Sequence, residues 1–183
     1  MPLILLPDSR VSLRKNAAGA IMLLDGVYFY PIINKGAFFM ADKNIMSYET
    51  VALDEENHAL VIIDQTKLPG EVEILHLTEQ KDIWQAIYLL QVRGAPAIGV
   101  AAGFGLYLAA RQIQAEDFDG FYRQLHEAKE YLNSSRPTAV NLSWALNRME
   151  QVALDNRDKP VAEIKELLRR ECIAIKDEDV WMC

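Results

Sequence analysis

The sequence has few residues of the types that hold metal ions or build disulfide frameworks. It contains only two cysteines, Cys172 and Cys183, and three scattered histidines, with no CxxC motif. This arrangement lacks the ligand spacing of the common zinc and haem-attachment motifs. So small a number of cysteines also fits the reducing cytosol, where disulfides are rare. We therefore expect no metal site and a cytoplasmic protein.

The sequence also lacks a long apolar run and an excess of basic residues. The apolar run from Ala20 to Ile33 contains Asp25 and Gly26 and is too short to cross a bilayer. Charged residues interrupt the apolar N-terminus too early for a signal peptide. Asp and Glu number 26 against 19 Lys and Arg, which gives a formal net charge of -7. Because nucleic-acid binding needs a basic face, we expect neither a membrane nor a nucleic acid as a partner.

The first half of the sequence carries strand signals. Ile21–Leu24 and Val27–Tyr30 flank Asp25-Gly26, a dipeptide typical of tight hairpin turns. Residues 50–53 and 59–63 flank a polar turn and predict a second hairpin. Because these strands precede all the helical patterns and no parallel βαβ series is present, the fold class is α+β. We expect a small antiparallel β-sheet followed by an all-helical bundle.

From Thr78, the expected N-cap, the apolar period becomes helical. A first helix has Ile83, Ile87 and Leu90 on one face, and Pro96 starts a second helix that is apolar nearly all round and therefore buried. Three later helices are expected, and Asp117 or Asp119 caps the first of them. The inner face of the second has Leu142, Ala145, Leu146 and Met149, and that of the third has Ile164, Leu167, Leu168 and Cys172.

One stretch, residues 92–99 with the sequence VRGAPAIG, joins the first two helical patterns. Gly94 can adopt backbone angles closed to other residues, and Pro96 suits the first position of a helix. The free N–H groups of that first turn, the positive end of the helix dipole and the adjacent Arg93 together form an anion site. The alternative is a helix–turn–helix corner whose arginine faces water.

Arg136 repeats this arrangement, because it also ends a helix just before a proline, Pro137, that starts the next helix. If the helical hairpins pack antiparallel, both junctions fall at the same end of the bundle. Two guanidinium groups then converge on one anion, and their paired donors match the geometry of a phosphate. Thr138 and Asn141 add polar contacts. The alternative is that each arginine only caps the C-terminus of the preceding helix.

Three segments resemble signatures of the methylthioribose-1-phosphate isomerase family, and they occur in the family's order. They are residues 63–69 (IDQTKLP), 92–99 (VRGAPAIG) and 136–142 (RPTAVNL). The similarity extends over residues 47–179. The family also includes ribose-1,5-bisphosphate isomerases and the regulatory subunits of a eukaryotic translation-initiation exchange factor.

The resemblance implies an aldose–ketose isomerase of methionine salvage that converts 5-methylthioribose 1-phosphate to 5-methylthioribulose 1-phosphate. It implies no metal and no organic cofactor. In the family the Arg-Gly-Ala segment binds substrate, which corresponds to Arg93, Gly94 and Ala95, and the arginine of Arg-Pro-Thr does so too, which corresponds to Arg136. The expected ligand is therefore a phosphorylated pentose. Apolar helix faces without a partner in this chain predict a homodimer.

The resemblance also identifies what this sequence does not contain. The family's catalytic cysteine, in a Thr-His-Cys-Asn-like segment, and its catalytic aspartate lie in a second, Rossmann-like domain, and neither motif is present. Cys183 comes too early for that cysteine, and Cys172 fits the core face of a helix. Asp64 and His76 have no motif for acid–base chemistry, so a loop cap and a surface histidine are expected there. We therefore expect no catalytic residue and no isomerase turnover by this chain alone.

The expected domain organisation follows from the span of the resemblance. Residues 1–46 are an N-terminal extension with a β-hairpin, and residues 47–183 are the N-terminal domain of an isomerase-like protein. Within it we expect strands and a loop over 47–77 and helices over 78–183. A different class of function also stays open, namely a non-catalytic binding or assembly module like the exchange-factor subunits. The intact arginine motifs favour the isomerase, or the related ribose-1,5-bisphosphate isomerase.

Overall fold

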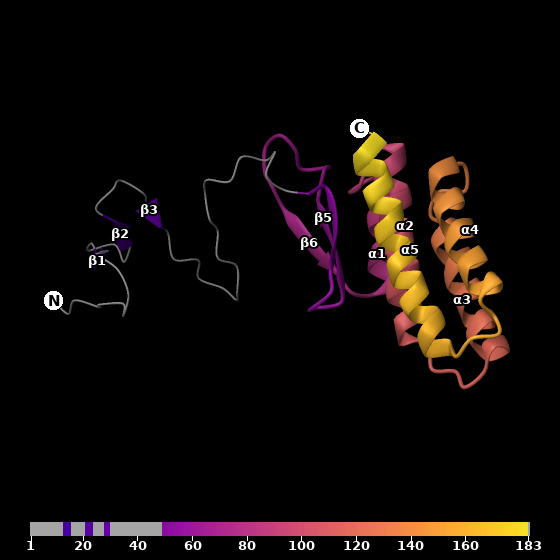
Figure 1. The fold of residues 1–183 in the computed structure, drawn as a ribbon. Helices are drawn as coiled ribbons and strands as arrows, with labels where there is room; N and C mark the ends of the chain where they lie inside the picture. The colour runs from indigo at the N-terminus through magenta and orange to yellow at the C-terminus, as the bar shows by residue number, and fades with distance from the viewer. Residues whose placement is uncertain (1–12, 16–20, 24–27, 30–48, 183) are drawn as a thin grey trace. The chain divides into compact units, whose positions relative to one another are not determined.

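The chain divides into two compact units, Met1–Lys43 and Asn44–Cys183. The computed structural model describes residues 13–15, 21–23, 28–29 and 49–182 (Figure 1). The expected boundary between residues 46 and 47 lies outside these ranges, as does the Asp25-Gly26 turn. In the first unit a three-stranded antiparallel sheet has the order β1-β2-β3, with these bounds: β1 (Leu13–Lys15), β2 (Ile21–Leu23) and β3 (Tyr28–Phe29).

The second unit begins with an antiparallel sheet of order β4-β5-β6. Its strands are β4 (Val51–Asp54), β5 (Ala59–Ile63) and β6 (Ile74–Leu77). The predicted pairing of β4 with β5 is confirmed, with Val51 opposite Ile62. Strand β6 was not predicted, because it is a short edge strand that buries little.

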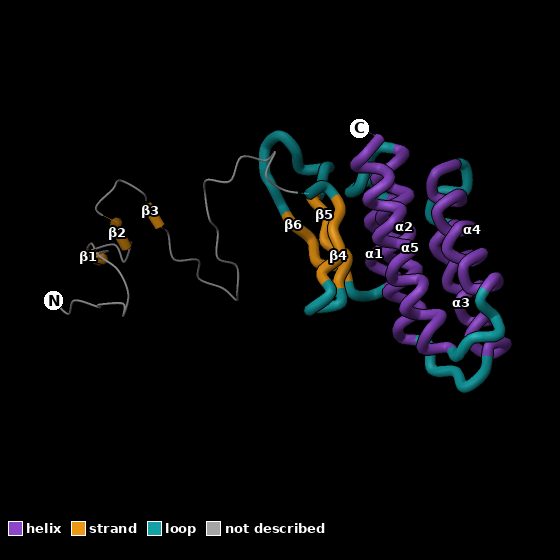
Figure 2. Tube along the Cα trace, viewed as in Figure 1, coloured by secondary structure: helices purple, strands orange, loops and turns teal. Residues whose placement is uncertain are grey.

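Five helices follow in the described part of this unit. Their bounds are α1 (Gln80–Tyr88), α2 (Ala95–Gln112), α3 (Phe118–Asn133), α4 (Val140–Asp155) and α5 (Val161–Met182). The sheet, orange in Figure 2, contacts α2 through β4 and β5 and contacts α1 through β6. The α+β class and its order, strands and then helices, are confirmed. None of these helices is both long and apolar enough to cross a membrane.

Helix α2 is the centre of this unit, because it contacts the other four helices as well as the sheet. Its Phe104 and Leu106 side chains are buried, as expected for a helix that is apolar on every side. Gly105 lets α1 approach closely, since a Cβ built on it would lie 2.9 Å from Cγ2 of Ile83. The surrounding elements therefore hold α2, and with it the position of its N-terminus.

Three predictions about helix ends are wrong. The N-cap of α1 is Glu79 rather than Thr78, and no side chain caps it. Leu90 does not extend the inner face of α1, because the helix ends at Tyr88 and Leu90 has a left-handed φ of 61°. Pro137 does not start α4. It lies in a turn closed by the Ala139 N–H donating to the Arg136 carbonyl at 2.9 Å, and the helix begins only after that turn.

Other local predictions are confirmed. Asp117 caps α3, and its carboxylate accepts a hydrogen bond from the Gly120 N–H at 2.7 Å. On the expected inner face of α5, Ile164, Leu168 and Cys172 are buried, whereas Leu167 is only half-buried. The expected inner face of α4 is also buried, namely Leu142, Ala145, Leu146 and Met149.

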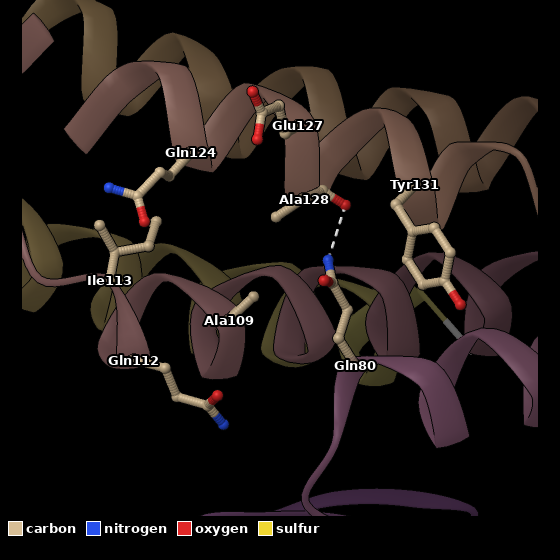
Figure 3. A pocket seen from close by; sticks show the side chains of 8 residues that line it. All are labelled: Gln80, Ala109, Gln112, Ile113, Gln124, Glu127, Ala128 and Tyr131. Carbon is tan, nitrogen blue, oxygen red and sulfur yellow. Dashed lines mark hydrogen bonds between the residues drawn. The ribbon is translucent and has the colours of Figure 1, made fainter. Parts of the chain in front are cut away.

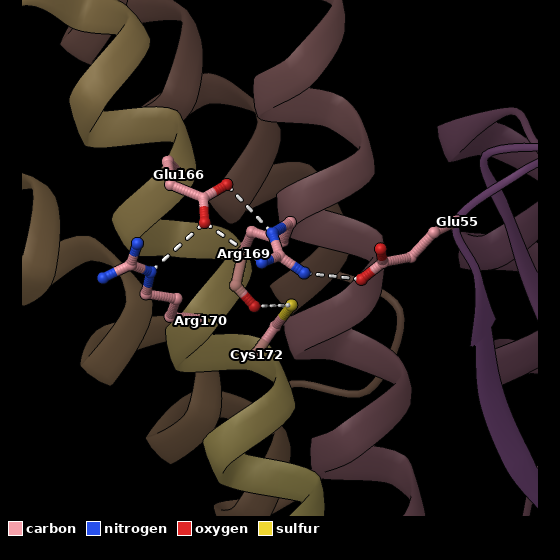
Figure 4. A network of polar contacts seen from close by, with 5 residues as sticks. All are labelled: Glu55, Glu166, Arg169, Arg170 and Cys172. Carbon is pink, nitrogen blue, oxygen red and sulfur yellow. Dashed lines mark hydrogen bonds and ion pairs between the residues drawn. The ribbon is translucent and has the colours of Figure 1, made fainter.

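Charged side chains join α5 to the rest of the unit. Arg169 on α5 donates to Glu55, in the turn between β4 and β5, at 2.7 Å and also pairs with Glu166 (Figure 4). Arg148 on α4 pairs with Glu171 and Glu178 on α5. These contacts fix the side of α5 that faces the hairpin and α4.

A half-buried carboxylate, Glu150, lies between α3 and α4. It accepts hydrogen bonds from Lys129 at 2.8 Å, from His126 at 2.6 Å and from Tyr122 at 3.3 Å. Burial raises the pKa of Glu150, but the hydrogen bonds from Lys129 and His126 outweigh it, so the net pKa lies below its ordinary value. Because the folded pKa is the lower one, this group stabilises the fold above its unfolded pKa, and the stabilisation is lost as the pH falls through the folded value.

We predict that Glu150→Gln lowers the free energy of unfolding by about 2 kcal/mol at pH 7, because the negative charge is lost and the amide nitrogen then faces at least one of the three donors. At pH 3 the difference from the unsubstituted chain shrinks, since this pH lies below the ordinary pKa of a glutamate and the stabilisation by the ionised carboxylate is lost as the pH falls. Urea unfolding at both pH values measures this. Glu163→Gln is the control, because Glu163 pairs with Lys159 at the surface of one helix end and such pairs contribute about 0.5 kcal/mol or less. An equal loss at both pH values contradicts the argument.

Candidate anion site

The N-termini of α2 and α4 lie side by side. A Cβ built on Gly99, in the second turn of α2, would lie 3.0 Å from the carbonyl oxygen of Asn141, in the first turn of α4. Figure 1 shows the α2–α3 and α4–α5 connections together at the opposite end of the bundle. The two junctions that carry Arg93 and Arg136 are therefore at the same end, as the antiparallel packing predicts.

The N-cap residues of these helices, Gly94 and Ala139, make no side-chain capping hydrogen bond in the described part of the chain. In α2 the first paired amide is that of Ile98, which donates to the Gly94 carbonyl at 3.0 Å, and in α4 it is that of Ser143. Among the described residues, five amides before them have no partner, two in α2 and three in α4, and they are Ala95, Ala97, Val140, Asn141 and Leu142. Adjoining helix N-termini with free N–H groups favour a bound anion.

The chain enters α2 through Gly94, whose φ is 90°. This left-handed value is open to glycine at little cost, and it turns the backbone so that Ala95 is the first helical residue. Pro96 therefore occupies the second position of the helix rather than the expected first. Its missing N–H costs nothing there, because the helix has no acceptor for it.

Arg93 is exposed directly before this turn. Its main-chain N–H donates to Oε1 of Gln65 at 2.8 Å, and its side-chain Nε donates to the Leu90 carbonyl at 3.1 Å. The second contact is made within the turn after α1 and not to the last carbonyls of the helix, so it differs from the helix cap that the sequence left open. It leaves both terminal nitrogens of the guanidinium without an acidic partner among the described residues. These nitrogens can donate to a phosphate.

Arg136 is half-buried in the turn that leads into α4. None of the ion pairs of the described residues involves its guanidinium. The structure thus places Arg93, Gly94, Ala95 and Arg136 at one end of the bundle. Gln65 was not predicted as a site residue from the sequence, although it lies in one of the three signature segments.

Two other candidates in the sequence have structural roles. Asp64 is a loop cap, as expected, because its carboxylate accepts from the N–H and hydroxyl of Thr66. Cys172 is buried on α5 and donates to the Arg169 carbonyl, and burial raises the pKa of its thiol to about 12. A thiol that stays protonated at neutral pH is a poor nucleophile, which agrees with the core position predicted for it.

One cavity lies away from the anion site. It has a volume of about 420 Å³ and opens between α1, α3 and the C-terminal end of α2 (Figure 3). Gln80 crosses it to donate to the Ala128 carbonyl at 2.8 Å. A smaller cavity of about 140 Å³ adjoins the N-terminal end of α2 at Ala97 and Val100. No group of acidic, histidine or cysteine side chains suited to a metal ion occurs in the described ranges.

Residues 91–183 match the model of the Initiation factor 2 subunit family. This segment includes both arginine junctions and all of α2 to α5. The chain belongs to the Initiation factor 2 subunit family. The membership agrees with the family group that the three signature segments indicate, in which isomerases and initiation-factor subunits are related.

Two curated relatives of this family member are sugar-phosphate isomerases by name. The chain is 55% identical over 131 residues to the methylthioribose-1-phosphate isomerase of Symbiobacterium thermophilum, covering 72% of this chain and 36% of the relative. It is 48% identical over 130 residues to a 5-deoxyribose 1-phosphate isomerase of Clostridium botulinum, covering 71% of this chain and 37% of the relative. The chain thus spans little more than a third of the length of the relatives it matches.

Two solved structures are also similar. A 5-methylthioribose 1-phosphate isomerase from Pyrococcus horikoshii matches with a TM-score of 0.67 and 40% identity, covering 70% of this chain and 36% of that one. The translation initiation factor eIF-2B, subunit delta, from A. fulgidus matches with a TM-score of 0.66 and 39% identity, covering 73% of this chain and 38% of that one. The same fold therefore occurs in a protein named as an isomerase and in a protein named as an initiation-factor subunit.

Proposed function

We propose that this family member is the substrate-binding part of an S-methyl-5-thioribose-1-phosphate isomerase, and that the shared end of α2 and α4 binds the phosphate of the sugar. The supporting observation is that five amides at two adjoining helix N-termini, beside Arg93 and Arg136, have no partner among the residues that the structure describes. Helix N-termini and guanidinium groups are the two kinds of donor best suited to a phosphate. The curated isomerases named above carry ribose 1-phosphate derivatives in their names.

The proposed reaction converts a cyclic aldose phosphate to an open-chain ketose phosphate. The phosphate on C1 blocks simple ring opening, so the site has to promote C–O cleavage and move a hydrogen from C2 to C1. This requires a positioned acid–base group in a dry pocket. The carboxylate of Asp64 is buried and caps its own loop, and His76 is exposed. The chain therefore supplies binding, and a catalytic cysteine and aspartate come from a second, Rossmann-like domain.

The rest of the proposal follows from that role. The protein acts in the cytoplasm, in methionine salvage, as a homodimer without metal or cofactor. A second candidate function is a non-catalytic assembly module, and the likeness to the subunit named eIF-2B delta is the observation that favours it. A ribose-1,5-bisphosphate isomerase is the alternative within the enzyme class, because its substrate also carries a 1-phosphate that the arginines can bind.

Phosphorus NMR of 5-methylthioribose 1-phosphate mixed with the chain tests the proposal. We expect the substrate phosphorus resonance to shift or broaden as chain is added, with no ketose phosphate signal over several hours. Steady conversion to the ketose refutes the claim that this chain does not turn over. An unchanged resonance, for this sugar and for 5-deoxyribose 1-phosphate, refutes phosphate binding by the chain and leaves the assembly module.

A further inference from the structure

The loop after β5 contains a buried carboxylate that the proposed function leaves unexplained. Asp64 is 2% exposed, and it accepts hydrogen bonds from the Thr66 N–H at 2.9 Å, the Thr66 hydroxyl at 2.6 Å and Nε2 of Gln91 at 2.7 Å. Burial raises the pKa of Asp64, but the hydrogen bonds from Thr66 and Gln91 outweigh it and leave the pKa below its ordinary value. The group is therefore charged at neutral pH, with donors on both of its oxygens.

The partners of this loop lie in the connection between α1 and α2. Besides the bond from Gln91 to Asp64, the Gln65 N–H donates to the Gln91 carbonyl at 2.9 Å, and the Arg93 N–H donates to Oε1 of Gln65 at 2.8 Å. Two successive loop residues thus hold two positions of the connection through three hydrogen bonds. The second of these positions is the arginine of the anion site.

This connection has a backbone that needs such support. Leu90 has a φ of 61° and Gly94 a φ of 90°, and Val92 between them is buried. A left-handed leucine is unfavourable and persists only where the surrounding contacts fix it. The hydrogen bonds from the loop are contacts of this kind, because they bracket the buried valine on both sides.

We propose that Asp64 and Gln65 are positioning residues, which set the Arg93–Ala95 segment so that its side chain and amides face the bound phosphate. The inference rests on the proposed function, since it assigns the loop a role in that site. Gln65 occupies the Arg93 N–H, so the amides left for an anion begin after Arg93. Asp64 acts one step further away, by fixing the carboxamide of Gln91.

Gln65→Met and Gln65→Glu test the direct contact. Methionine removes the acceptor while keeping the length of the side chain, whereas glutamate keeps an acceptor oxygen. Hydrogen exchange of the Arg93 amide and calorimetric titration with ribose 1-phosphate are measured for both, together with the midpoint of thermal unfolding. We expect Gln65→Met to speed exchange at Arg93 and to weaken binding by about tenfold each, with the rest of the chain protected as before and with Gln65→Glu close to the unsubstituted protein.

Asp64→Ala and Asp54→Ala form a matched pair for the indirect contact. Asp54 also caps a turn, by accepting from the Asn57 N–H at 3.0 Å, but it is the last residue of β4, and among the described residues it makes no hydrogen bond to the α1–α2 connection. We expect faster exchange at Arg93 for Asp64→Ala only. Unchanged exchange at Arg93 in both Gln65→Met and Asp64→Ala overturns the inference, as does weaker binding without faster exchange.

Failure of the proposed function is a separate outcome. If the unsubstituted chain does not bind ribose 1-phosphate, phosphate binding by this chain is wrong, and the positioning of Arg93 is then decided by exchange alone. Faster exchange at Arg93 in Gln65→Met, at an unchanged midpoint of thermal unfolding, supports the positioning contact in that case. An unchanged rate refutes it.

Discussion

Replacing either Arg93 or Arg136 by alanine is expected to weaken the binding of ribose 1-phosphate by about 10- to 100-fold. Each substitution removes hydrogen bonds to a charged group, which contribute about 1.5–3 kcal/mol. Neither guanidinium has an acidic partner among the described residues. The loss of affinity therefore reflects missing contacts with the ligand rather than a broken ion pair within the protein. Calorimetric titration of each variant gives the change in dissociation constant.

Arg157→Ala is the control for both substitutions. Arg157 is exposed in the connection between α4 and α5, at the opposite end of the bundle, and its removal leaves the total charge equal to that of the other variants. We expect binding by this variant to match the unsubstituted chain. If Arg136→Ala also binds as the unsubstituted chain does, the two arginines do not share one anion, and only the α2 junction forms the site.

The second large effect is expected for Gly99→Ala, which we predict to lower the free energy of unfolding by about 2 kcal/mol. The new methyl group would lie 3.0 Å from the Asn141 carbonyl oxygen, a main-chain atom that moves only if α4 moves. The two helix N-termini then separate, so binding of ribose 1-phosphate weakens as well. Urea unfolding and the calorimetric titration measure the two effects.

Gly103→Ala is the matched control in the same helix. A Cβ on Gly103 meets only the side chains of Ile175 and Cys172, at 3.5 and 3.8 Å, which is ordinary packing distance. Because alanine favours a helix over glycine by about 1 kcal/mol, we expect this variant to be more stable than the unsubstituted chain and to bind the sugar phosphate unchanged. Equal destabilisation by both substitutions means that close approach of α4 is not what Gly99 provides.

Much of this fold follows from local sequence, and the errors occur where tertiary contacts decide. The apolar run after Pro96 predicts α2 because it continues through nearly the whole helix, and Asp117 predicts the start of α3 because a side-chain cap is a local contact. The end of α1 is different. The apolar Leu90 continues the helical period, but the helix ends two residues earlier, and the loop after β5 forms hydrogen bonds with the segment that follows. Pro137 also misled, because the same residue suits a turn and a first helical turn.

The candidate site was predictable in its residues but not in its geometry. Arg93, Gly94 and Arg136 stand out in the sequence through their glycine and proline neighbours. Antiparallel packing of the helices then brings the junctions to one end of the bundle, and the absence of a side chain at Gly99 lets α2 and α4 come into contact. The role of Gln65 could not be read from the sequence, because its partner is the main-chain N–H of Arg93, and that contact spans 28 positions of the chain.

Amide NMR of the chain during titration with ribose 1-phosphate tests the central claim most directly. If the N-termini of α2 and α4 bind one phosphate together, the amide signals of Ala95 and Asn141 shift along a single saturation curve. Shifts confined to one of the two helices, or two curves with different midpoints, contradict a shared site.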